Sequence, residues 1–304
     1  MRASSIRMQD RARAEWWPGA VAACAALFAL TLGACSAGST TYTSDADHGA
    51  TQTLITIERR ETAGIPTAQT EVFASFVRTP PEVDPGAVTR VTGLDLGLPD
   101  LGECSALNTG RDGSIALTPL RRVELLDAGD VSLETEAGRL ELARRAFPAV
   151  TDLMAGIVYT TRDQSAELPP GSSYALTVAG SAQVPTFAIR ADAPPAFESL
   201  SVDGVPLASA TELGARSLLT WSPGSERDVV YVSLQSAAVA GTTLCAFRDS
   251  AGQGRIAAHA LPPSGQALLS VHRLRSVPLT PSVGTGELRF DFEQSVPVQI
   301  TPAE

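Results

Sequence analysis

Histidine is the first residue type to consider for chemistry, because imidazole serves both in proton transfer and in metal binding. The chain has three, His48, His259 and His272. No H-x-H or H-E-x-x-H pattern occurs, and no histidine stands at a zinc-site spacing from Cys245. The G-x-S-x-G elbow of many serine hydrolases is also absent from the sequence. We therefore expect no metal site and no cofactor. Serine catalysis with His259 or His272 is an alternative that no sequence motif supports.

Two carboxylate pairs have a spacing that places both members on one face of a strand. They are Glu134 with Glu136, and Asp291 with Glu293. A glycosidase needs two carboxylates across a cleft, one of them with a pKa raised by burial. Same-face pairs near turns more often keep a sheet soluble and protect its edges. We therefore predict that both pairs are solvated.

The cysteines are the other reactive side chains. Cys24 lies inside an apolar run and Cys35 ends it, whereas Cys104 and Cys245 lie far along the chain. In an oxidising compartment, two thiols pair if the fold brings their Cα atoms within about 6 Å. Cys104 and Cys245 are thus candidates for a disulfide that would clamp the two halves of the chain together, and two separate buried thiols are the alternative.

The elements that must position these residues have the pattern of β-strands. Short runs with period-two character, separated by Gly-, Pro- and Asp-containing turns, follow one another from Thr53 onward. The predicted strands are 54–57, 71–77, 114–117, 122–126, 131–134, 139–142, 156–160, 173–178, 184–189, 217–221, 228–234, 243–247, 254–258, 267–274 and 287–292. Only Leu140–Met154 is ambiguous between helix and strand.

This spacing predicts an all-β fold with two antiparallel β-sandwich domains of the immunoglobulin or fibronectin kind. The run Asp192-Ala193-Pro194-Pro195 marks a rigid hinge between an N-terminal β domain, 53–192, and a C-terminal immunoglobulin-like domain, 195–304. Trp221 and Cys245 are expected in the core of the second domain. Residues 35–52 are small and polar, as in a flexible tether.

An apolar run, Ala20–Ala34, follows an arginine-bearing start and is broken only by Thr31 and Gly33. As a helix it would rise about 22 Å, short of the roughly 30 Å thickness of the hydrocarbon layer. The order of parts is that of an export signal over residues 1–34. An uncleaved anchor that uses Trp16 and Trp17 at the interface, or an ordinary secretory cleavage, are the alternatives.

The residues Leu32-Gly33-Ala34-Cys35 resemble the lipobox of bacterial lipoproteins. The resemblance implies that the Cys35 thiol is lipidated (palmitate among the acyl chains), that residues 1–34 are removed, and that the protein is membrane-bound through lipid. Ser36 stands where the inner-membrane retention signal of that family would be Asp, so the resemblance implies the outer membrane.

Turn-and-strand signatures resemble modules of predicted lipoproteins from GC-rich Gram-negative bacteria. They are 126–131 and 170–174 in the first half, and 221–224, 229–234 and 245–249 in the second. That family has no assigned activity, so the resemblance implies an architecture and a location but no catalytic residues.

The composition is that of a folded, acidic protein, with 44% hydrophobic and 18% charged residues and a net charge of −10. No basic run exceeds a doublet, which excludes a nucleic-acid partner. We therefore expect a non-catalytic lipoprotein, anchored in the outer membrane, that displays or binds a protein, peptide or glycan or supports the envelope. A cell-envelope hydrolase is the alternative. Arginines and the aromatic residues Trp221, Tyr159, Tyr174 and Tyr231 are the side chains best suited to an interface.

Overall fold

The computed structural model describes residues 50–81, 85–107, 123–147, 154–236, 241–280 and 284–301. They form a fold that is almost entirely β. The strands are β1 (Ala50–Thr62), β2 (Gln69–Thr79), β3 (Cys104–Leu107), β4 (Val123–Leu125), β5 (Val131–Thr135), β6 (Gly138–Glu141), β7 (Ala143–Phe147), β8 (Met154–Thr160), β9 (Ser173–Val178), β10 (Phe187–Asp192), β11 (Ser201–Val202), β12 (Val205–Pro206), β13 (Glu212–Leu213), β14 (Leu218–Thr220), β15 (Val229–Ser236), β16 (Thr242–Arg248), β17 (Gln253–Arg255), β18 (Gly265–Pro278) and β19 (Thr285–Ile300). The helices are α1 (Pro85–Val91) and the short 3₁₀ turns η2 (Leu207–Ser209), η3 (Asp249–Ala251) and η4 (Ala258–Ala260).

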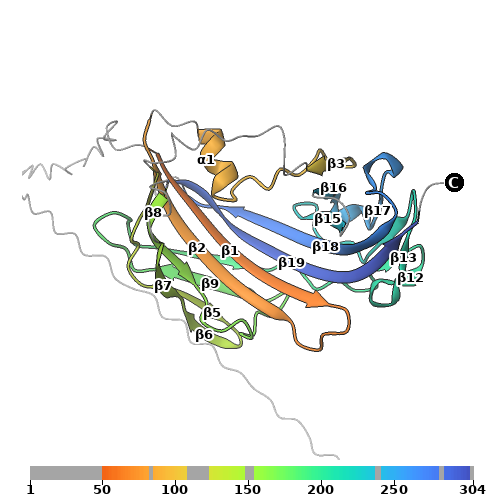
Figure 1. The fold of residues 1–304 in the computed structure, drawn as a ribbon. Helices are drawn as coiled ribbons and strands as arrows, with labels where there is room; N and C mark the ends of the chain where they lie inside the picture. The colour runs from red at the N-terminus through yellow and green to blue at the C-terminus, as the bar shows by residue number, and fades with distance from the viewer. Residues whose placement is uncertain are drawn as a thin grey trace, which may run out of the picture. The chain divides into compact units, whose positions relative to one another are not determined.

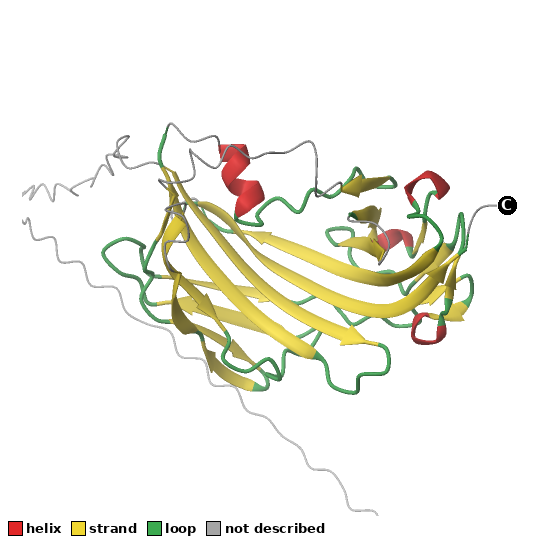
Figure 2. Cartoon of the chain, in the orientation of Figure 1, coloured by secondary structure: helices red, strands yellow, loops and turns green. Residues whose placement is uncertain are grey.

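The largest sheet among the described residues has 11 strands, in the order β3-β16-β15-β18-β19-β1-β2-β4-β8-β7 with β13 also paired to β19. Its centre is built by the long strands β1, β2, β18 and β19, which run side by side (Figures 1 and 2). β18 and β19 pair antiparallel, whereas β1 pairs parallel with β19. The parallel pairing differs from the expected antiparallel pattern, and it brings the first strand beside the last.

One small sheet, β10-β9-β5-β6, packs against the part of the large sheet that contains β1, β2 and the first half of β19. Leu133, Tyr174 and Leu176 of the small sheet share a core with Ile55 and Phe290 of the large one. The rings of Tyr174 and Phe290 meet edge to face, with centroids 5.2 Å apart. This packing is a β-sandwich.

A second small sheet, β12-β11-β14-β17, packs against the part of the large sheet that contains β15, β16, β18 and the second half of β19. Val202 and Leu219 from the small sheet share this core with Val232 and Leu269 from the large sheet. Trp221 and Cys245 are buried in it, as expected from the sequence. The fold therefore consists of two β-sandwiches.

The two sandwiches share the large sheet. The change of core falls between Ala193 and Leu200, close to the expected boundary at 193–194. No break in the large sheet accompanies it within the described residues, because β18 and β19 continue through both cores and Asp45–Glu304 form one compact unit. The expected domains, 53–192 and 195–304, are thus distinguished by their cores and joined by common strands.

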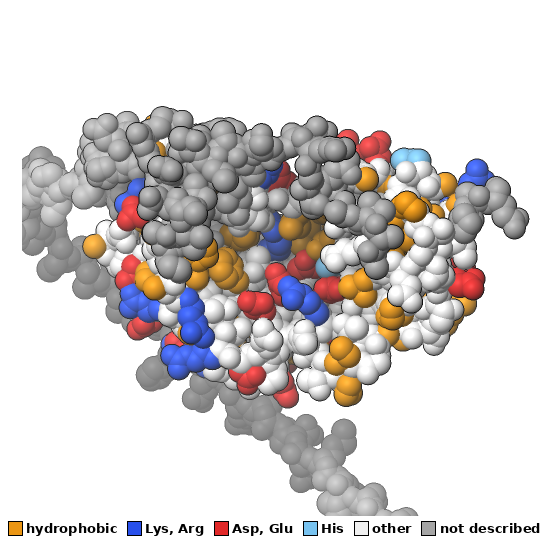
Figure 3. Space-filling view, viewed as in Figure 1, with side chains coloured by type: hydrophobic (Ala, Val, Ile, Leu, Met, Phe, Trp, Pro, Cys, Tyr) orange, Lys and Arg blue, Asp and Glu red, His pale blue; other side chains and the backbone are white. Residues whose placement is uncertain are grey.

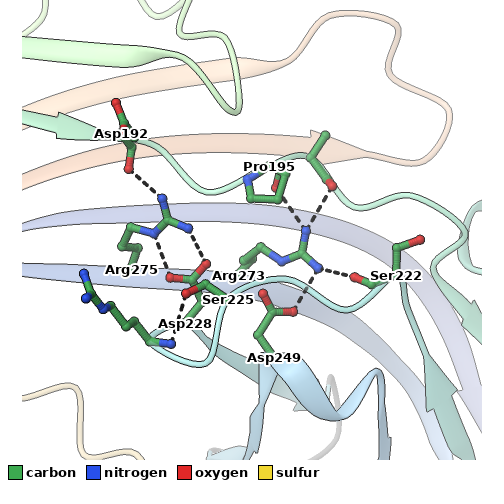
Figure 4. Close-up of polar contacts among 10 residues, drawn as sticks. Asp192, Pro195, Ser222, Ser225, Asp228, Asp249, Arg273 and Arg275 are labelled. Carbon is green, nitrogen blue, oxygen red and sulfur yellow. Dashed lines mark hydrogen bonds and ion pairs between the residues drawn. The ribbon is translucent and has the colours of Figure 1, made fainter.

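Two arginines of β18 hold the linker between the sandwiches (Figure 4). Arg273 donates to the carbonyl oxygens of Pro195, Ala196 and Ser222 and to Asp249 Oδ1, at 2.8–3.1 Å. Arg275 donates to both carboxylate oxygens of Asp228 and to the carbonyl oxygen of Asp192.

Two local expectations are corrected or resolved here. The tether does not extend to residue 52, because Ala50–Gln52 belong to β1 and pair with Val77–Thr79 of β2. The stretch Leu140–Met154, which was ambiguous between helix and strand, is strand over β6 and β7. Its residues 148–153 lie outside the described residues, as does the predicted strand 114–117.

Among the described residues, no helix is long and apolar enough to cross a membrane.

Candidate functional site

A groove lies on the face of the large sheet that points away from the two sandwich cores. Its volume is about 390 Å³, and it is lined by side chains of β1, β15, β16, β18 and β19 together with Leu96 and Leu98. Acidic, basic and histidine side chains gather in a hollow of the molecule seen in Figure 3. We call this feature the outer-face groove.

The strand register explains why charged residues meet there. Glu58 of β1 lies opposite Asp291 of β19, and Arg60 lies opposite Glu293. On the other side of β19, Glu293 lies opposite His272 of β18. Cross-strand partners project from the same face of a sheet, so these residues from distant parts of the chain form one polar row.

Asp291 is the centre of a hydrogen-bonded cluster. His272 Nδ1 donates to Asp291 Oδ1 at 2.9 Å, and Tyr231 Oη donates to Asp291 Oδ2 at 2.6 Å. The rings of Tyr231 and His272 are stacked, with centroids 4.1 Å apart and planes inclined by 9°. Both carboxylate oxygens of Asp291 are thus engaged, and the imidazole is fixed in orientation by two partners.

The electrostatics of the cluster follow from these contacts. Burial opposes ionisation of Asp291, but the attraction to His272 and the hydrogen bonds from His272 and Tyr231 outweigh it and hold the pKa of Asp291 below its usual value. Burial, and next the negative charge of Asp291, raises the pKa of Tyr231 well above its usual value. Burial also raises the pKa of Glu58, and the charges of Asp291 and Glu71 add to this despite the neighbouring Arg60. The raised pKa of Glu58 thus reflects burial first and the crowding of carboxylates around the groove second.

Residues 92–107, which we call the strap, form one wall of the outer-face groove. Near its beginning, Arg289 of β19 donates to the carbonyl oxygens of Gly93 and Leu94 at 2.7 and 2.6 Å. In the middle, Leu96 and Leu98 pack on Tyr231, and beyond them Gly102 N donates to the carbonyl oxygen of Ala246. The strap is thus fixed to the sheet along its length.

A disulfide, one of the two alternatives that the sequence left open for Cys104 and Cys245, closes the strap. Cys104 in β3 and Cys245 in β16 lie directly opposite each other, with Cα atoms 4.0 Å apart, and their sulfurs are bonded. The bond joins a segment of the first half of the chain to the sheet of the second half. It therefore clamps the two halves, as expected, and it does so at the end of the groove wall.

Several sequence predictions are corrected by this arrangement. The pair Asp291 and Glu293 is not solvated, since these side chains are only 15% and 14% exposed beneath the strap. His272 projects from the outer face of the sheet, where it lines the groove and is only 12% exposed. Glu134 and Glu136 are exposed, as predicted, and His259 is exposed on η4.

The aromatic residues proposed as interface side chains are buried. Tyr159 and Tyr174 are fully inaccessible in the first core, where Tyr159 Oη donates to Asp127, and Trp221 belongs to the second core. Only Tyr231 lines the outer-face groove. Cys35 and the segment 1–34 lie outside the described residues.

Sequence reasoning missed Glu58, Arg60, Ser233 and Ser270 as groove residues. Ser233 and Ser270 alternate with apolar neighbours, which is a signal for an outward face, whereas Arg60 lies between Arg59 and Glu61 and carries no such signal. The alternation could not show that a non-periodic segment, the strap, covers that face. Among the described residues, no group of three or more His, Cys, Asp or Glu side chains is arranged to hold a metal ion.

No family model matches this sequence, and no curated protein matches it. Among solved structures, the chain is similar to the FN1–FN3 domains of chicken CNTN1, at 13% identity and a TM-score of 0.19, over 84% of this chain and 69% of that one. It is also similar to a two-domain fibronectin type-III segment of chicken tenascin, at 10% identity and a TM-score of 0.21, over 72% of this chain and 89% of that one. At these TM-scores neither likeness supports any conclusion about the groove.

Proposed function

We propose that this chain is an exported, lipid-anchored and non-catalytic binding protein of the cell envelope, which binds its ligand in the outer-face groove. The observation that carries this proposal is the groove itself. Its volume, about 390 Å³, falls in the range of small-molecule sites, and it combines a wall of leucines with a larger set of polar and charged side chains. Its polar side chains stand on mutually paired strands, which hold them in place.

The location is argued from the N-terminal segment, in which Leu32–Cys35 resemble a lipobox and Ser36 favours the outer membrane. The Cys104–Cys245 disulfide supports export, because disulfides persist in oxidising compartments. Two or three acyl chains on Cys35 would hold the protein firmly at the membrane.

The variant Cys35→Ala tests the location. We expect it to lose labelling by radioactive palmitate and to accumulate as unprocessed precursor, while Cys104→Ala keeps the label. A labelled Cys35→Ala protein would refute the anchor.

A binding role is favoured over acyl transfer by the backbone around the groove. β15, β18 and β19 are each paired on both sides, so their backbone N–H groups are used in the sheet and are not free to form an oxyanion hole. Among the described residues, His272 forms its hydrogen bond through Nδ1, and no serine hydroxyl is bonded to its Nε2.

The second candidate function is a cell-envelope hydrolase. The observation in its favour is that the Asp291–His272 pair shares the groove with the hydroxyls of Ser233 and Ser270. A fluorophosphonate probe separates the two candidates, because it labels activated serines. We expect no labelling of the full chain, and labelling that disappears in Ser270→Ala would establish the hydrolase.

Binding in the groove is tested by thermal shift of the detergent-solubilised full chain against peptides, glycans and aliphatic amines. A ligand at 100 times its Kd stabilises the folded state by about 2.7 kcal/mol. We expect at least one class to raise the Tm, and Ser270→Val, which narrows the groove, to abolish the shift. Thr177→Val on the exposed face of β9 is the matched control. A shift equal in all three proteins would contradict binding in the groove.

A further inference from the structure

The charges of the outer-face groove are unbalanced. Three carboxylates, those of Glu58, Asp291 and Glu293, line it together with one guanidinium, that of Arg60, and one imidazole, that of His272. Arg60 bonds Glu58 and lies 3.6 Å from Glu293, so it is shared between them. Each oxygen of Asp291 already accepts a hydrogen bond, from His272 or from Tyr231. Within the described part of the chain, Glu293 has only its 3.6 Å contact with Arg60 and is therefore the carboxylate with the most capacity left for a ligand.

Two serines of low exposure, whose hydroxyls have no partner among the described residues, provide an independent observation. Ser233 and Ser270 lie directly opposite each other on β15 and β18 and both line the groove. They are 7% and 4% exposed. Among the described residues, neither side chain has a hydrogen-bond partner, although serines buried to this degree are normally bonded. Their oxygens can accept hydrogen bonds from a group that enters the groove.

The rest of the lining is mainly aliphatic. Leu96 and Leu98 of the strap and Leu244 and Leu268 of the sheet line the same groove, and Gln235 and Thr242 are the other polar side chains there. A ligand that satisfies the whole site therefore has one cationic, hydrogen-bond-donating end and an aliphatic stem.

We infer that the outer-face groove binds an aliphatic primary ammonium group, with Glu293 as its counter-charge and the hydroxyls of Ser233 and Ser270 as further acceptors; this inference rests on the proposed binding function. An ammonium group has three N–H donors, so it can bond a carboxylate and hydroxyl oxygens at the same time. The four-carbon stem of a lysine side chain, or the chain of a free diamine, suits the leucine wall.

Other ligand classes fit the groove less well. The excess of carboxylates repels anions. A divalent metal ion needs several free oxygen ligands, but both oxygens of Asp291 are engaged and Arg60 occupies the space between Glu58 and Glu293. A neutral sugar would leave the charge of Glu293 unbalanced.

The inference is tested by calorimetric titration of the detergent-solubilised full chain. One arm uses 1,5-diaminopentane and the other an N-acetylated, C-amidated peptide with one lysine. 1-Pentanol and the same peptide with an acetylated lysine are the uncharged controls. We expect the amines to bind and the controls not to bind. Binding of the diamine points to a free amine as the source, and binding of the peptide alone points to a lysine side chain.

Variants locate the site. Glu293→Gln should weaken amine binding by at least about tenfold, because it removes a charge-assisted hydrogen bond, and Ser270→Ala by severalfold. Glu134→Gln, on an exposed face of β5, should bind as the wild type does. If Glu293→Gln fails to fold, salt dependence of the wild-type affinity serves instead, because added salt weakens binding of a cation and not of a neutral ligand.

Two results would overturn the inference. In the first, neither amine binds, but a neutral ligand binds the wild type and not Ser270→Val. The ammonium assignment then fails, and the proposed binding function stands. If the amines bind equally to the wild type and to Glu293→Gln, the ammonium does not lie in this groove.

Discussion

Arg273 is among the largest fully buried side chains of the described residues, at 1% exposure. Its guanidinium donates to three backbone carbonyl oxygens and to Asp249, and it lies over the ring of Phe197 at 4.4 Å from the centroid. A buried charge of this kind contributes little net stability while it is paired, and removal of one partner leaves the other uncompensated. Arg273 thus ties the linker at Pro195 and Ala196 to β18.

We therefore predict that Arg273→Met destabilises the fold by about 3–5 kcal/mol, because Asp249 remains buried without its counter-charge. The control is Arg139→Met, which breaks the exposed ion pair of Arg139 with Glu141 and should cost less than about 1 kcal/mol. Urea unfolding measures both, and equal losses would contradict the assigned role of Arg273.

Asp291 provides a pH-dependent prediction at the same scale. Its pKa is lower in the folded than in the unfolded state, so its contribution to stability is fully present above the unfolded pKa. That contribution is lost as the pH falls through the folded pKa.

Asp291→Asn should therefore be less stable than the wild type by about 1–3 kcal/mol at pH 7, and the difference should close as the pH falls below about 4. Unfolding curves measured from pH 7 to pH 2 test this. A difference that stays constant over the whole range would show that the charge of Asp291 plays no part.

At the scale of elements, the strap decides whether the polar row of the large sheet is a groove or a solvated face. It has no regular hydrogen-bond pattern of its own between α1 and β3, and it is held by Arg289, the two leucines and the disulfide.

Loss of the disulfide should free the end of the strap. Cys104→Ala/Cys245→Ala should lower the free energy of unfolding by about 3–5 kcal/mol, as expected for a bond that closes a loop of 141 residues. It should also abolish ligand binding in the groove. Reductant should lower the stability and ligand binding of the wild type by the same amounts and should not change the double variant. A wild type whose stability does not respond to reductant under denaturing conditions would contradict the disulfide.

Much of the strand content was predictable, and the pairing of distant strands was not. β9, β15 and β16 lie close to their predicted ranges because alternating apolar residues and flanking turns are local signals. The parallel pairing of β1 with β19 joins segments more than 200 residues apart, which no local pattern encodes. The contact of His272 with Asp291 depends on the register of β18 and β19, so the sequence revealed the residues but not the site.

At the scale of the molecule, the shared sheet makes the two sandwiches one structural unit. β18 and β19 contribute to both cores, so loss of either core exposes strands that the other requires. We therefore predict a single calorimetric unfolding transition for the described part of the chain.

Leu176→Ala in the first core and Leu219→Ala in the second test this prediction, since both side chains are fully buried. Each should cost about 2–5 kcal/mol and lower the Tm of the same transition. Two transitions, each sensitive to one variant, would instead indicate independent domains.

The central claim is that the outer-face groove is a binding site for a cationic ligand. The most direct measurement follows the imidazole resonances of His272 and His259 by NMR while the full chain is titrated with 1,5-diaminopentane. His272 lies in the groove and His259 is exposed on η4. We predict a saturable shift of the His272 resonances and none for His259. Unchanged His272 resonances, or equal shifts of both residues, would contradict the claim.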